Sequence, residues 1–349
     1  MGKKISVCIP AYNRSAVLPE LLDSILEQDY TAYEVLICED DSRERPQIRA
    51  IVERYDALYP GRIRYIENEK NLGYDKNMRT LVANAQGEYC MFMGNDDLMC
   101  KGALKKVAST LDRYENVGVI VRSYASFENT PDNIKQIFRY FPEERVFPAG
   151  ADSISTVFRR SVVIPGMVVH TKAAQRLKTS RFDGTLLYQV FLIANILVEM
   201  KAVFLPDILV YWRIGGIPEH GTAEVEQGKF VPADRTPASS LQFMKGMLDV
   251  AAGVEKERGV IVYKRIVADI SNYSYPILAV QARQPLPVFF AYWLGLAKLG
   301  FGRYPLFHCY FLSLVLLGEK RMDRVIASIK RHFGHTPVIG SVFKGESAR

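Results

Sequence analysis

The sequence has few cysteines and lacks the glycine-rich loop that many nucleotide-binding enzymes use to hold phosphates. Its 349 residues include five cysteines, and these show none of the spacings typical of a metal site. Cys8, Cys38 and Cys90 lie in short apolar runs, so we expect inert core thiols in a reducing compartment. The motif Gly-x-x-x-x-Gly-Lys is absent, which argues against a P-loop kinase or ATPase.

Long apolar runs are also missing. The two very apolar stretches near the C-terminus, residues 288–299 and 306–318, are shorter than the ~20 residues that a membrane-spanning helix needs. Residues 1–4 lead directly into a predicted strand, so we expect no secretory signal. Together these features predict a cytoplasmic protein.

The composition is that of a globular protein, with 48% apolar and 24% charged residues. The length suits one large α/β domain with an appendage, or two domains. The net charge of +7 is easier to place near the C-terminus and fits an anionic partner or surface.

Short apolar runs alternate with amphipathic segments through the first third of the chain. The runs are rich in β-branched residues, whereas the intervening segments repeat apolar residues at helical spacing. This β-α alternation predicts a doubly wound, mostly parallel α/β sheet. The predicted strands are residues 4–10, 33–38, 63–67, 89–93 and 117–122.

The most informative stretch is residues 88–98, in which an apolar run ends abruptly in Gly94, Asn95, Asp96 and Asp97. Ligands of open α/β sheets bind at the carboxyl ends of strands, where these carboxylates would lie. Oxygen ligands suit Mg²⁺ or Mn²⁺, which commonly bridge a carboxylate to a diphosphate. The alternative is a turn in which one aspartate caps the next helix. Two further polar loops, at residues 12–14 and 39–42, follow other strands, and the three loops together predict a cleft.

Four stretches in this order resemble the family-two glycosyltransferases of GT-A fold, and they cover roughly the first third of the chain. They are Ser-Val-Cys-Ile-Pro-Ala-Tyr-Asn-Arg (6–14), Glu-Val-Leu-Ile-Cys-Glu-Asp-Asp-Ser (34–42), Asn-Leu-Gly (71–73) and Gly-Glu-Tyr-Cys-Met-Phe-Met-Gly-Asn-Asp-Asp (87–97). Within the family, the chain is similar to bacterial enzymes that build lipid-linked surface polysaccharides, abequosyltransferases among them. The resemblance implies a GT-A-like sheet, and from Ala238 onward the sequence pattern itself predicts a helical C-terminal region.

The resemblance also implies site residues. Asp97 would bind the metal ion and take part in catalysis, and Asp96 would contact the ribose or the sugar. The sequence departs from the family at two positions. Gly94 stands where the family often has an aspartate, and Glu39 replaces a usual aspartate, which leaves the identity of the nucleotide base open. The other implied contacts to the nucleotide-sugar are Pro10, Ala11, Tyr12, Asn13, Arg14, Glu39, Asp40, Asn71 and Asn77.

An inverting family member needs a general base that deprotonates the acceptor hydroxyl. Members commonly carry a Glu-Asp pair at this stage of the chain, and this sequence does not. Asp183 is the nearest carboxylate, so we predict it as the base, with a turn or helix cap before Gly184 as the alternative. Gln189 could only orient the sugar or acceptor.

A long glycine-rich loop follows residue 213 and extends to about residue 236, so we expect it to be mobile. Family members often close such a loop over the donor. Arg213 could then contact the diphosphate, and His220 could be a metal ligand or a diphosphate contact. The alternative for His220 is a solvated loop histidine.

The predicted domains are a catalytic domain (1–235) and a helical region (236–349). The catalytic domain comprises a nucleotide-sugar half (1–125) and an acceptor half (126–235). Aromatic side chains in 288–318, followed by the cations of 320–332, suit helices in a membrane interface. The alternative is a helical hairpin packed on the catalytic domain or in a homodimer.

The sequence therefore predicts a metal-dependent glycosyltransferase with Mn²⁺ or Mg²⁺. It would move a hexosyl or deoxyhexosyl group from a nucleotide-sugar to a saccharide acceptor. We expect this acceptor to be lipid-linked and the reaction to belong to O-antigen or capsule-type polysaccharide synthesis. We expect no nucleic acid partner. The rival prediction is a catalytically inactive nucleotide-sugar-binding or scaffold protein. A sugar nucleotidyltransferase is disfavoured because no glycine-rich loop follows the first strand.

Overall fold

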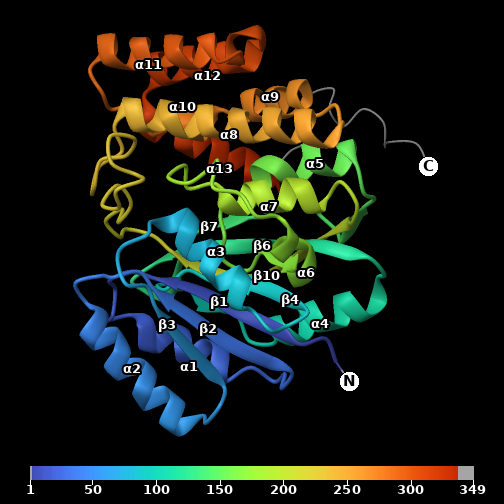
Figure 1. Ribbon diagram of the computed structural model, residues 1–349. Helices are drawn as coiled ribbons and strands as arrows, with labels where there is room; N and C mark the ends of the chain where they lie inside the picture. The colour runs from blue at the N-terminus through green and yellow to red at the C-terminus, as the bar shows by residue number, and fades with distance from the viewer. Residues whose placement is uncertain (1, 337–349) are drawn as a thin grey trace.

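A sheet of ten strands forms the centre of the protein (Figure 1). The structure is a computed structural model that describes residues 2–336. The strand order is β3-β2-β1-β4-β9-β6-β10-β5, with β7 paired to β6 and β8 paired to β10. The strands are β1 (Ile5–Ala11), β2 (Tyr33–Glu39), β3 (Ile63–Glu67), β4 (Tyr89–Phe92), β5 (Leu98–Met99), β6 (Val117–Glu128), β7 (Thr130–Phe138), β8 (Arg145–Phe147), β9 (Val168–His170) and β10 (Lys201–Arg213).

Most of the central strands run parallel, and the predicted doubly wound α/β sheet is confirmed. Strands β3, β2, β1 and β4 are parallel neighbours, as are β6 and β10. Helical crossovers join the parallel strands because chain reversal between parallel strands needs a long connection. Strand β9 lies antiparallel between β4 and β6 and joins the two parallel groups.

Helices cover both faces of the sheet. Figure 1 shows α1, α2 and α4 on one face, and α3, α5, α6 and α7 on the other. Helix α1 buries Leu18, Leu21, Leu22 and Ile25, the spacing that gives a helix one apolar face. The helices are α1 (Leu18–Leu26), α2 (Arg45–Leu58), α3 (Tyr74–Asn84), α4 (Ala103–Arg113), α5 (Ala151–Val157), α6 (Thr171–Arg176) and α7 (Tyr188–Ile196).

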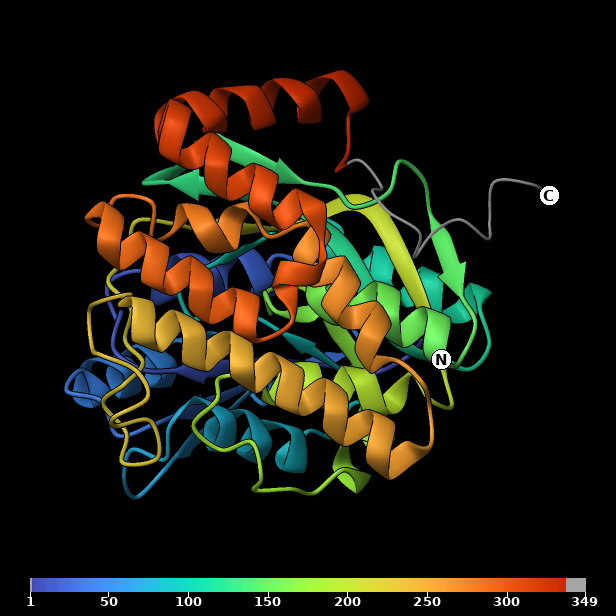
Figure 2. The same ribbon diagram turned by 90° about the horizontal axis from the view of Figure 1, so that it is seen from above.

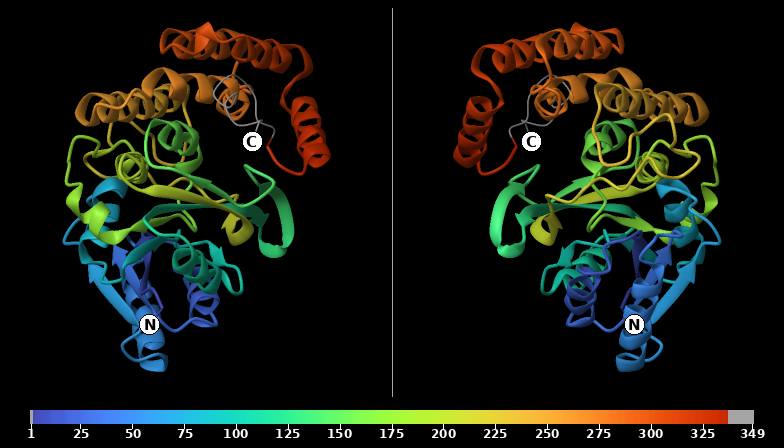
Figure 3. Two further views of the ribbon diagram at one scale, coloured as in Figure 1. Left: turned by 90° about the vertical axis from the view of Figure 1, so that its right-hand side faces the viewer. Right: turned by 90° about the vertical axis from the view of Figure 1, so that its left-hand side faces the viewer.

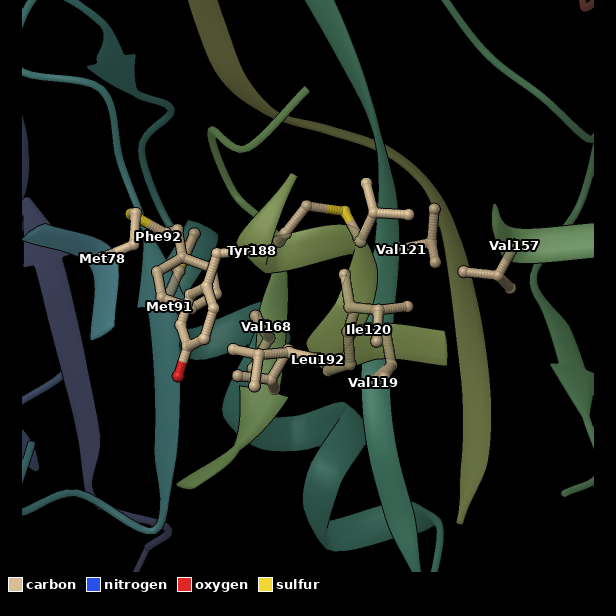
Figure 4. Packing of buried hydrophobic residues seen from close by; sticks show 14 of the residues in the cluster. Met78, Met91, Phe92, Val119, Ile120, Val121, Val157, Val168, Tyr188 and Leu192 are labelled. Atoms are coloured by element: carbon tan, nitrogen blue, oxygen red, sulfur yellow. The ribbon is translucent and has the colours of Figure 1, made fainter. Parts of the chain in front are cut away.

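Helix α7 is buried along its whole length because it lies between the sheet and the C-terminal helices. Figure 4 shows its Tyr188 and Leu192 beside Met91 of β4, Val168 of β9 and Ile120 of β6. A helix that is apolar on every side is expected only where it is covered on every side. Helix α7 is therefore the central element of the core on this face.

The C-terminal region is helical, as predicted. Helix α8 packs on α7, α11 packs on α8, and Figure 2 shows α11 and α12 on the outer side, nearest the viewer. One continuous cluster of buried apolar side chains includes Val190 of α7, Val250 of α8 and Phe289 of α11. The helices are α8 (Pro237–Arg258), α9 (Tyr263–Asn272), α10 (Tyr275–Ala279), α11 (Leu286–Lys298), α12 (Pro305–Leu317) and α13 (Glu319–Phe333).

No helix within residues 2–336 is both long and apolar enough to cross a membrane. The segment 127–148 contains a hairpin, because β7 folds back antiparallel on β6. Strand β10 is continuous from Lys201 to Arg213, with irregular register near Leu205 and Ile208.

Candidate active site

A cleft of about 400 Å³ opens at the carboxyl ends of β1, β2 and β4. It brings together residues from all three polar loops that the sequence places after these strands. Carboxylates and amides line one part of it, and apolar side chains line another. The lining residues of the polar part include Pro10, Tyr12, Arg14, Asp40, Asn71, Asn77, Asn95, Asp96, Asp97, Glu219, His220, Thr222 and Glu226.

The loop after β1 has a strained backbone. Asn13 and Arg14 adopt φ angles of 52° and 61°, in the left-handed region that residues other than glycine rarely occupy. Asn95 holds this loop by donating a 2.9 Å hydrogen bond to the carbonyl of Asn13. The resulting turn lets Arg14 form an ion pair with Asp96 inside the cleft. Arg14 therefore supplies the cation that the acidic pair needs.

The two adjacent aspartates face different surroundings. Asp97 is buried, and its Oδ1 accepts a 2.9 Å hydrogen bond from the backbone N–H of Arg213. Burial raises the pKa of Asp97 to about 6, although the Arg213 hydrogen bond and the charge of Arg14 oppose this effect. A Cβ at Gly94 would overlap Oδ2 of Asp97, which explains why this position has no side chain.

Asp97 and His220 are the lining groups best suited to a divalent metal ion. Burial lowers the pKa of His220, so its imidazole is neutral near pH 7 and can offer a lone pair. Within the described part of the chain, no cluster of three His, Cys, Asp or Glu side chains could hold a metal. Mg²⁺ commonly takes one or two carboxylates together with substrate phosphates and water. The residues therefore fit an ion that Asp97 and a diphosphate would share.

The two acids at the end of β2 have separate environments. Glu39 is fully buried, forms an ion pair with Arg45, and accepts hydrogen bonds from the backbone N–H groups of Asp41 (3.0 Å) and Ser42 (2.7 Å). Its carboxylate is occupied by its own loop and does not line the cleft. Asp40 does line the cleft.

Asp40 also holds the loop of residues 71–73 in place through hydrogen bonds. Its Oδ1 accepts hydrogen bonds from the side chain of Asn68 (2.7 Å) and the N–H of Leu72 (2.9 Å), and its Oδ2 accepts one from the N–H of Gly73 (2.9 Å). Burial raises the pKa of Asp40 to about 6, and these hydrogen bonds counteract part of the effect. Asp40 thus holds the loop that carries Asn71 at the cleft.

Arg213 supports the acidic loop from outside the cleft. Its Nε donates a 2.8 Å hydrogen bond to the carbonyl of Asp96, and its guanidinium forms a 2.6 Å ion pair with Glu20. Its backbone N–H binds Asp97, so one residue positions both aspartates.

Asp183 lies outside the cleft lining. Its carboxylate forms a bidentate ion pair with Arg79, with distances of 2.8 and 2.9 Å. Lys229 donates a 3.1 Å hydrogen bond to the carbonyl of Asp183. The carboxylate is therefore engaged in a partly buried pair between α3 and the segment before α7.

Gln189 lines the cleft. Its Nε2 donates a 2.9 Å hydrogen bond to the carbonyl of Val162, and its Oε1 accepts a 3.0 Å hydrogen bond from the Tyr74 hydroxyl. An amide cannot serve as a general base, so Gln189 acts as a structural contact here.

Nine of the predicted residues line the cleft, and five lie behind or beside it. The five are Ala11, Asn13, Glu39, Asp183 and Arg213, and the nine are Pro10, Tyr12, Arg14, Asp40, Asn71, Asn77, Asp96, Asp97 and His220. Sequence reasoning missed the apolar wall, because most of its members come from loops without a periodic pattern. That wall consists of Val162, Val163, Ile164, Pro165, Leu186, Trp212 and Phe243.

Comparison with known proteins supports the resemblance seen in the motifs. Residues 6–163 match the family model described as glycosyl transferase family 2. Abequosyltransferase RfbV of Salmonella typhimurium is 34% identical over 113 residues, which are 32% of this chain and 34% of that protein. Putative glycosyltransferase EpsE of Bacillus subtilis is 28% identical over 149 residues, 43% of this chain and 53% of that protein. The chain therefore spans about a third to a half of these curated relatives.

Two solved structures resemble nearly the whole chain. Staphylococcus aureus TarS 1–349 in complex with UDP-GlcNAc aligns with a TM-score of 0.57 and 17% identity, covering 95% of this chain and 92% of that one. The mannosyltransferase PcManGT from Pyrobaculum calidifontis, in complex with GDP-Man and Mn²⁺, aligns with a TM-score of 0.52 and 14% identity, covering 91% and 87%. At these identities the likeness establishes the fold, and the predicted GT-A-like architecture is confirmed.

Proposed function

Because residues 6–163 belong to glycosyl transferase family 2, we propose that this protein transfers a hexosyl or deoxyhexosyl group from a nucleotide-sugar to a saccharide. The observation that best supports this proposal is the cleft at the carboxyl ends of parallel strands, which Asp96, Asp97 and Arg14 line together. In the reaction, the bond from the anomeric carbon to the diphosphate oxygen breaks. An acceptor oxygen bonds to that carbon, and its proton passes to a base.

We assign the metal site to Asp97 and His220, with Mn²⁺ or Mg²⁺ as the ion. Such an ion supplies Lewis-acid stabilisation to a departing diphosphate. Arg14 lies at the same edge of the cleft, paired with Asp96, and its guanidinium can turn to a phosphate oxygen. PcManGT, whose fold this chain shares, was solved in complex with GDP-Man and Mn²⁺, and this supports the choice of a divalent ion.

We assign the general base to Glu219 in place of Asp183. Asp183 is held by Arg79, whereas Glu219 lines the cleft and accepts a 3.1 Å hydrogen bond from the Asn13 side chain. Glu219→Gln should lower turnover at least ~100-fold and leave donor binding intact. Glu224→Gln, an exposed change in the same loop, is the matched control. If Asp183→Asn abolishes transfer and Glu219→Gln does not, the base is Asp183.

The test of the function is a screen of nucleotide-sugars by thermal shift, with and without Mn²⁺, followed by release of nucleoside diphosphate with candidate acceptors. Stabilisation by one sugar nucleotide together with acceptor-dependent release supports the proposal. If no sugar nucleotide stabilises the protein and none is consumed, the proposal is wrong. Stabilisation without turnover would favour an inactive nucleotide-sugar-binding protein, the alternative suggested by the amide of Gln189 in the cleft.

We further propose that the acceptor is lipid-linked and that the protein docks on the cytoplasmic face of a membrane. Helices α11 to α13 carry many exposed apolar side chains, which we name the outer apolar surface. Figure 3 shows α11 and α12 on the outer side and α13 turning down beside β7. The members are Leu286, Val288, Phe290, Leu294, Leu312, Val315, Leu316, Leu317, Val325, Ile329 and Phe333.

The charge around the outer apolar surface favours a bilayer over a second copy of the chain. Residues 286–333 contain seven Lys and Arg but only two acids, Glu319 and Asp323. Glu319 is paired with Arg283, and Asp323 accepts a hydrogen bond from Tyr275. Anionic headgroups attract each nearby cation by about 1 kcal/mol, whereas two such surfaces repel one another.

The measurement is co-sedimentation with anionic liposomes at low and high salt. The wild type should bind at low salt and release partly at high salt, because salt screens the cations but not the apolar contact. Leu312→Glu with Leu316→Glu should prevent binding, whereas Leu58→Glu, an exposed leucine of α2, should not. A homodimer in solution that the Leu312 and Leu316 changes dissociate would assign the surface to self-association.

A further inference from the structure

The first turn of α3 is hydrogen-bonded to the start of α7 and to the residues just before it. Asp75, the second residue of α3, is 1% exposed and has its carboxylate against the backbone before Tyr188. Its Oδ2 accepts hydrogen bonds from the N–H groups of Thr185 and Leu186, both at 2.9 Å. Its Oδ1 accepts those of Leu187 at 2.8 Å and Tyr188 at 2.9 Å.

Two of these N–H groups, those of Leu187 and Tyr188, lie at the start of α7, where a helix leaves its N–H groups unpaired. Helix α7 begins at Tyr188, and its own N-cap, Leu187, has no side-chain acceptor. A carboxylate is favoured at this end because the helix dipole is positive there. Asp75 thus performs, from another helix, the capping role that Ser, Thr or Asp usually fills locally.

The neighbouring residue Tyr74 makes the second contact. Its hydroxyl donates a 3.0 Å hydrogen bond to Oε1 of Gln189, whose Nε2 donates to the carbonyl of Val162 at 2.9 Å. Gln189 is buried, so both ends of its amide are committed to the protein. Tyr74, Gln189 and Val162 all line the cleft, and the chain of contacts runs from α3 to the apolar wall.

Leu186 shows why this wall needs support. Its φ angle is +65°, a conformation that leucine rarely adopts, and its side chain lines the cleft. Asp75 binds the N–H of Leu186 and those on either side of it. Strained residues persist only where surrounding contacts hold them, and here Asp75 provides those contacts.

We propose that Tyr74 and Asp75 are positioning residues that fix the acceptor side of the cleft, the wall of Val162, Leu186 and Gln189. The inference rests on the proposed glycosyl transfer and deepens it. Helix α3 belongs to the nucleotide-binding part, which also supplies Asp40 and Asp97. Its first turn therefore sets the distance between the donor and the acceptor wall, the geometry on which in-line attack depends.

The test uses Tyr74→Phe, which removes one hydroxyl and leaves the ring. Tyr55→Phe is the matched control, because the Tyr55 hydroxyl is also hydrogen-bonded, to Asp23 at 2.7 Å, and Tyr55 does not line the cleft. Donor affinity is measured by calorimetry, and KM and kcat are measured against the acceptor. We expect Tyr74→Phe to lower the acceptor kcat/KM roughly tenfold while donor affinity changes less than roughly twofold. Tyr55→Phe should change neither value.

A second measurement does not depend on activity. Asp75→Asn should speed hydrogen exchange at the amides of residues 185–188, because an Asn side chain offers one acceptor oxygen in place of two. Unchanged exchange there would overturn the capping role of Asp75, whether or not the protein transfers sugar. Equal losses of donor affinity and acceptor kcat/KM in Tyr74→Phe would reduce Tyr74 to a general structural residue.

A double-mutant cycle tests the coupling between Tyr74 and Gln189. Tyr74→Phe and Gln189→Leu remove opposite ends of one hydrogen bond, so their effects on acceptor kcat/KM should be less than additive. Additive effects would contradict the coupling through Gln189. If the wild type consumes no nucleotide-sugar, the proposed function fails, and the exchange experiment alone then decides the role of Asp75.

Discussion

Asp97→Asn should make the protein more stable at pH 8 while removing the metal-dependent activity that we propose. Burial raises the pKa of Asp97 from 3.8 to about 6, so the fold disfavours the charged carboxylate. A difference of about two pH units corresponds to about 3 kcal/mol at most. Asparagine carries no charge and keeps an oxygen for the N–H of Arg213.

The sign of the pH dependence of stability follows from the difference in proton binding between the folded and unfolded states. The folded-state pKa of Asp97 lies above the unfolded one, so the folded state binds more protons between about pH 4 and pH 6. The stabilising contribution of this group is complete below its unfolded pKa and is lost as the pH rises through about 6. Asp40 and Asp75, whose pKa values are also raised to about 6, titrate in both proteins and cancel in the comparison.

The assay is urea unfolding of the wild type and Asp97→Asn in chelator at several pH values. The two free energies of unfolding should agree near pH 4 and diverge above pH 6, with the variant higher by up to about 3 kcal/mol. Adding Mn²⁺ and the donor should raise the melting temperature of the wild type only. Asp56→Asn, an exposed change on α2, controls for charge. A variant less stable than the wild type at pH 8 would refute the reasoning.

Two further changes probe the walls of the cleft. Gly94→Ala should lower metal-dependent turnover and reduce the free energy of unfolding by about 1–3 kcal/mol, because the new Cβ displaces the carboxylate of Asp97. A turnover assay measures the first effect, and urea unfolding measures the second. Arg122→Met should destabilise the protein by a few kcal/mol, roughly 1–3 for each carbonyl left unpaired, and raise the acceptor KM. The fully buried Arg122 guanidinium donates to the carbonyls of Pro165 and Val163, which lie in the apolar wall, and an unchanged KM would separate it from acceptor binding.

The strands of the first third were predictable because buried parallel strands appear as short continuous apolar runs. Strand β3 has the predicted bounds, Ile63–Glu67. Strands β2 and β4 differ from prediction by one residue at one end, and β1 is shifted by one residue. The stretch 162–170 was harder. It is apolar throughout, as a strand would be, but only Val168–His170 pairs in the sheet, and residues 162–165 line the cleft.

Contacts between distant side chains could not be predicted from spacing. Asp183, which the sequence suggested as a base, is paired with Arg79, 104 residues earlier. Asp75 caps a helix whose first residue lies 113 positions later. Each contact depends on how α3 packs against α7, which no local pattern encodes.

The period of a strand, by contrast, could have sharpened the site prediction. Successive side chains of a strand point to opposite faces, so neighbours at its end seldom enter the same cleft. Pro10 and Tyr12 line the cleft but Ala11 does not, and Asp40 lines it but Glu39 does not. Glu39 instead holds its own loop through Arg45, Asp41 and Ser42. We therefore expect Glu39 to act on a nucleotide only indirectly, by shaping the loop after β2, and Asp40 to make the direct contact from the end of this strand.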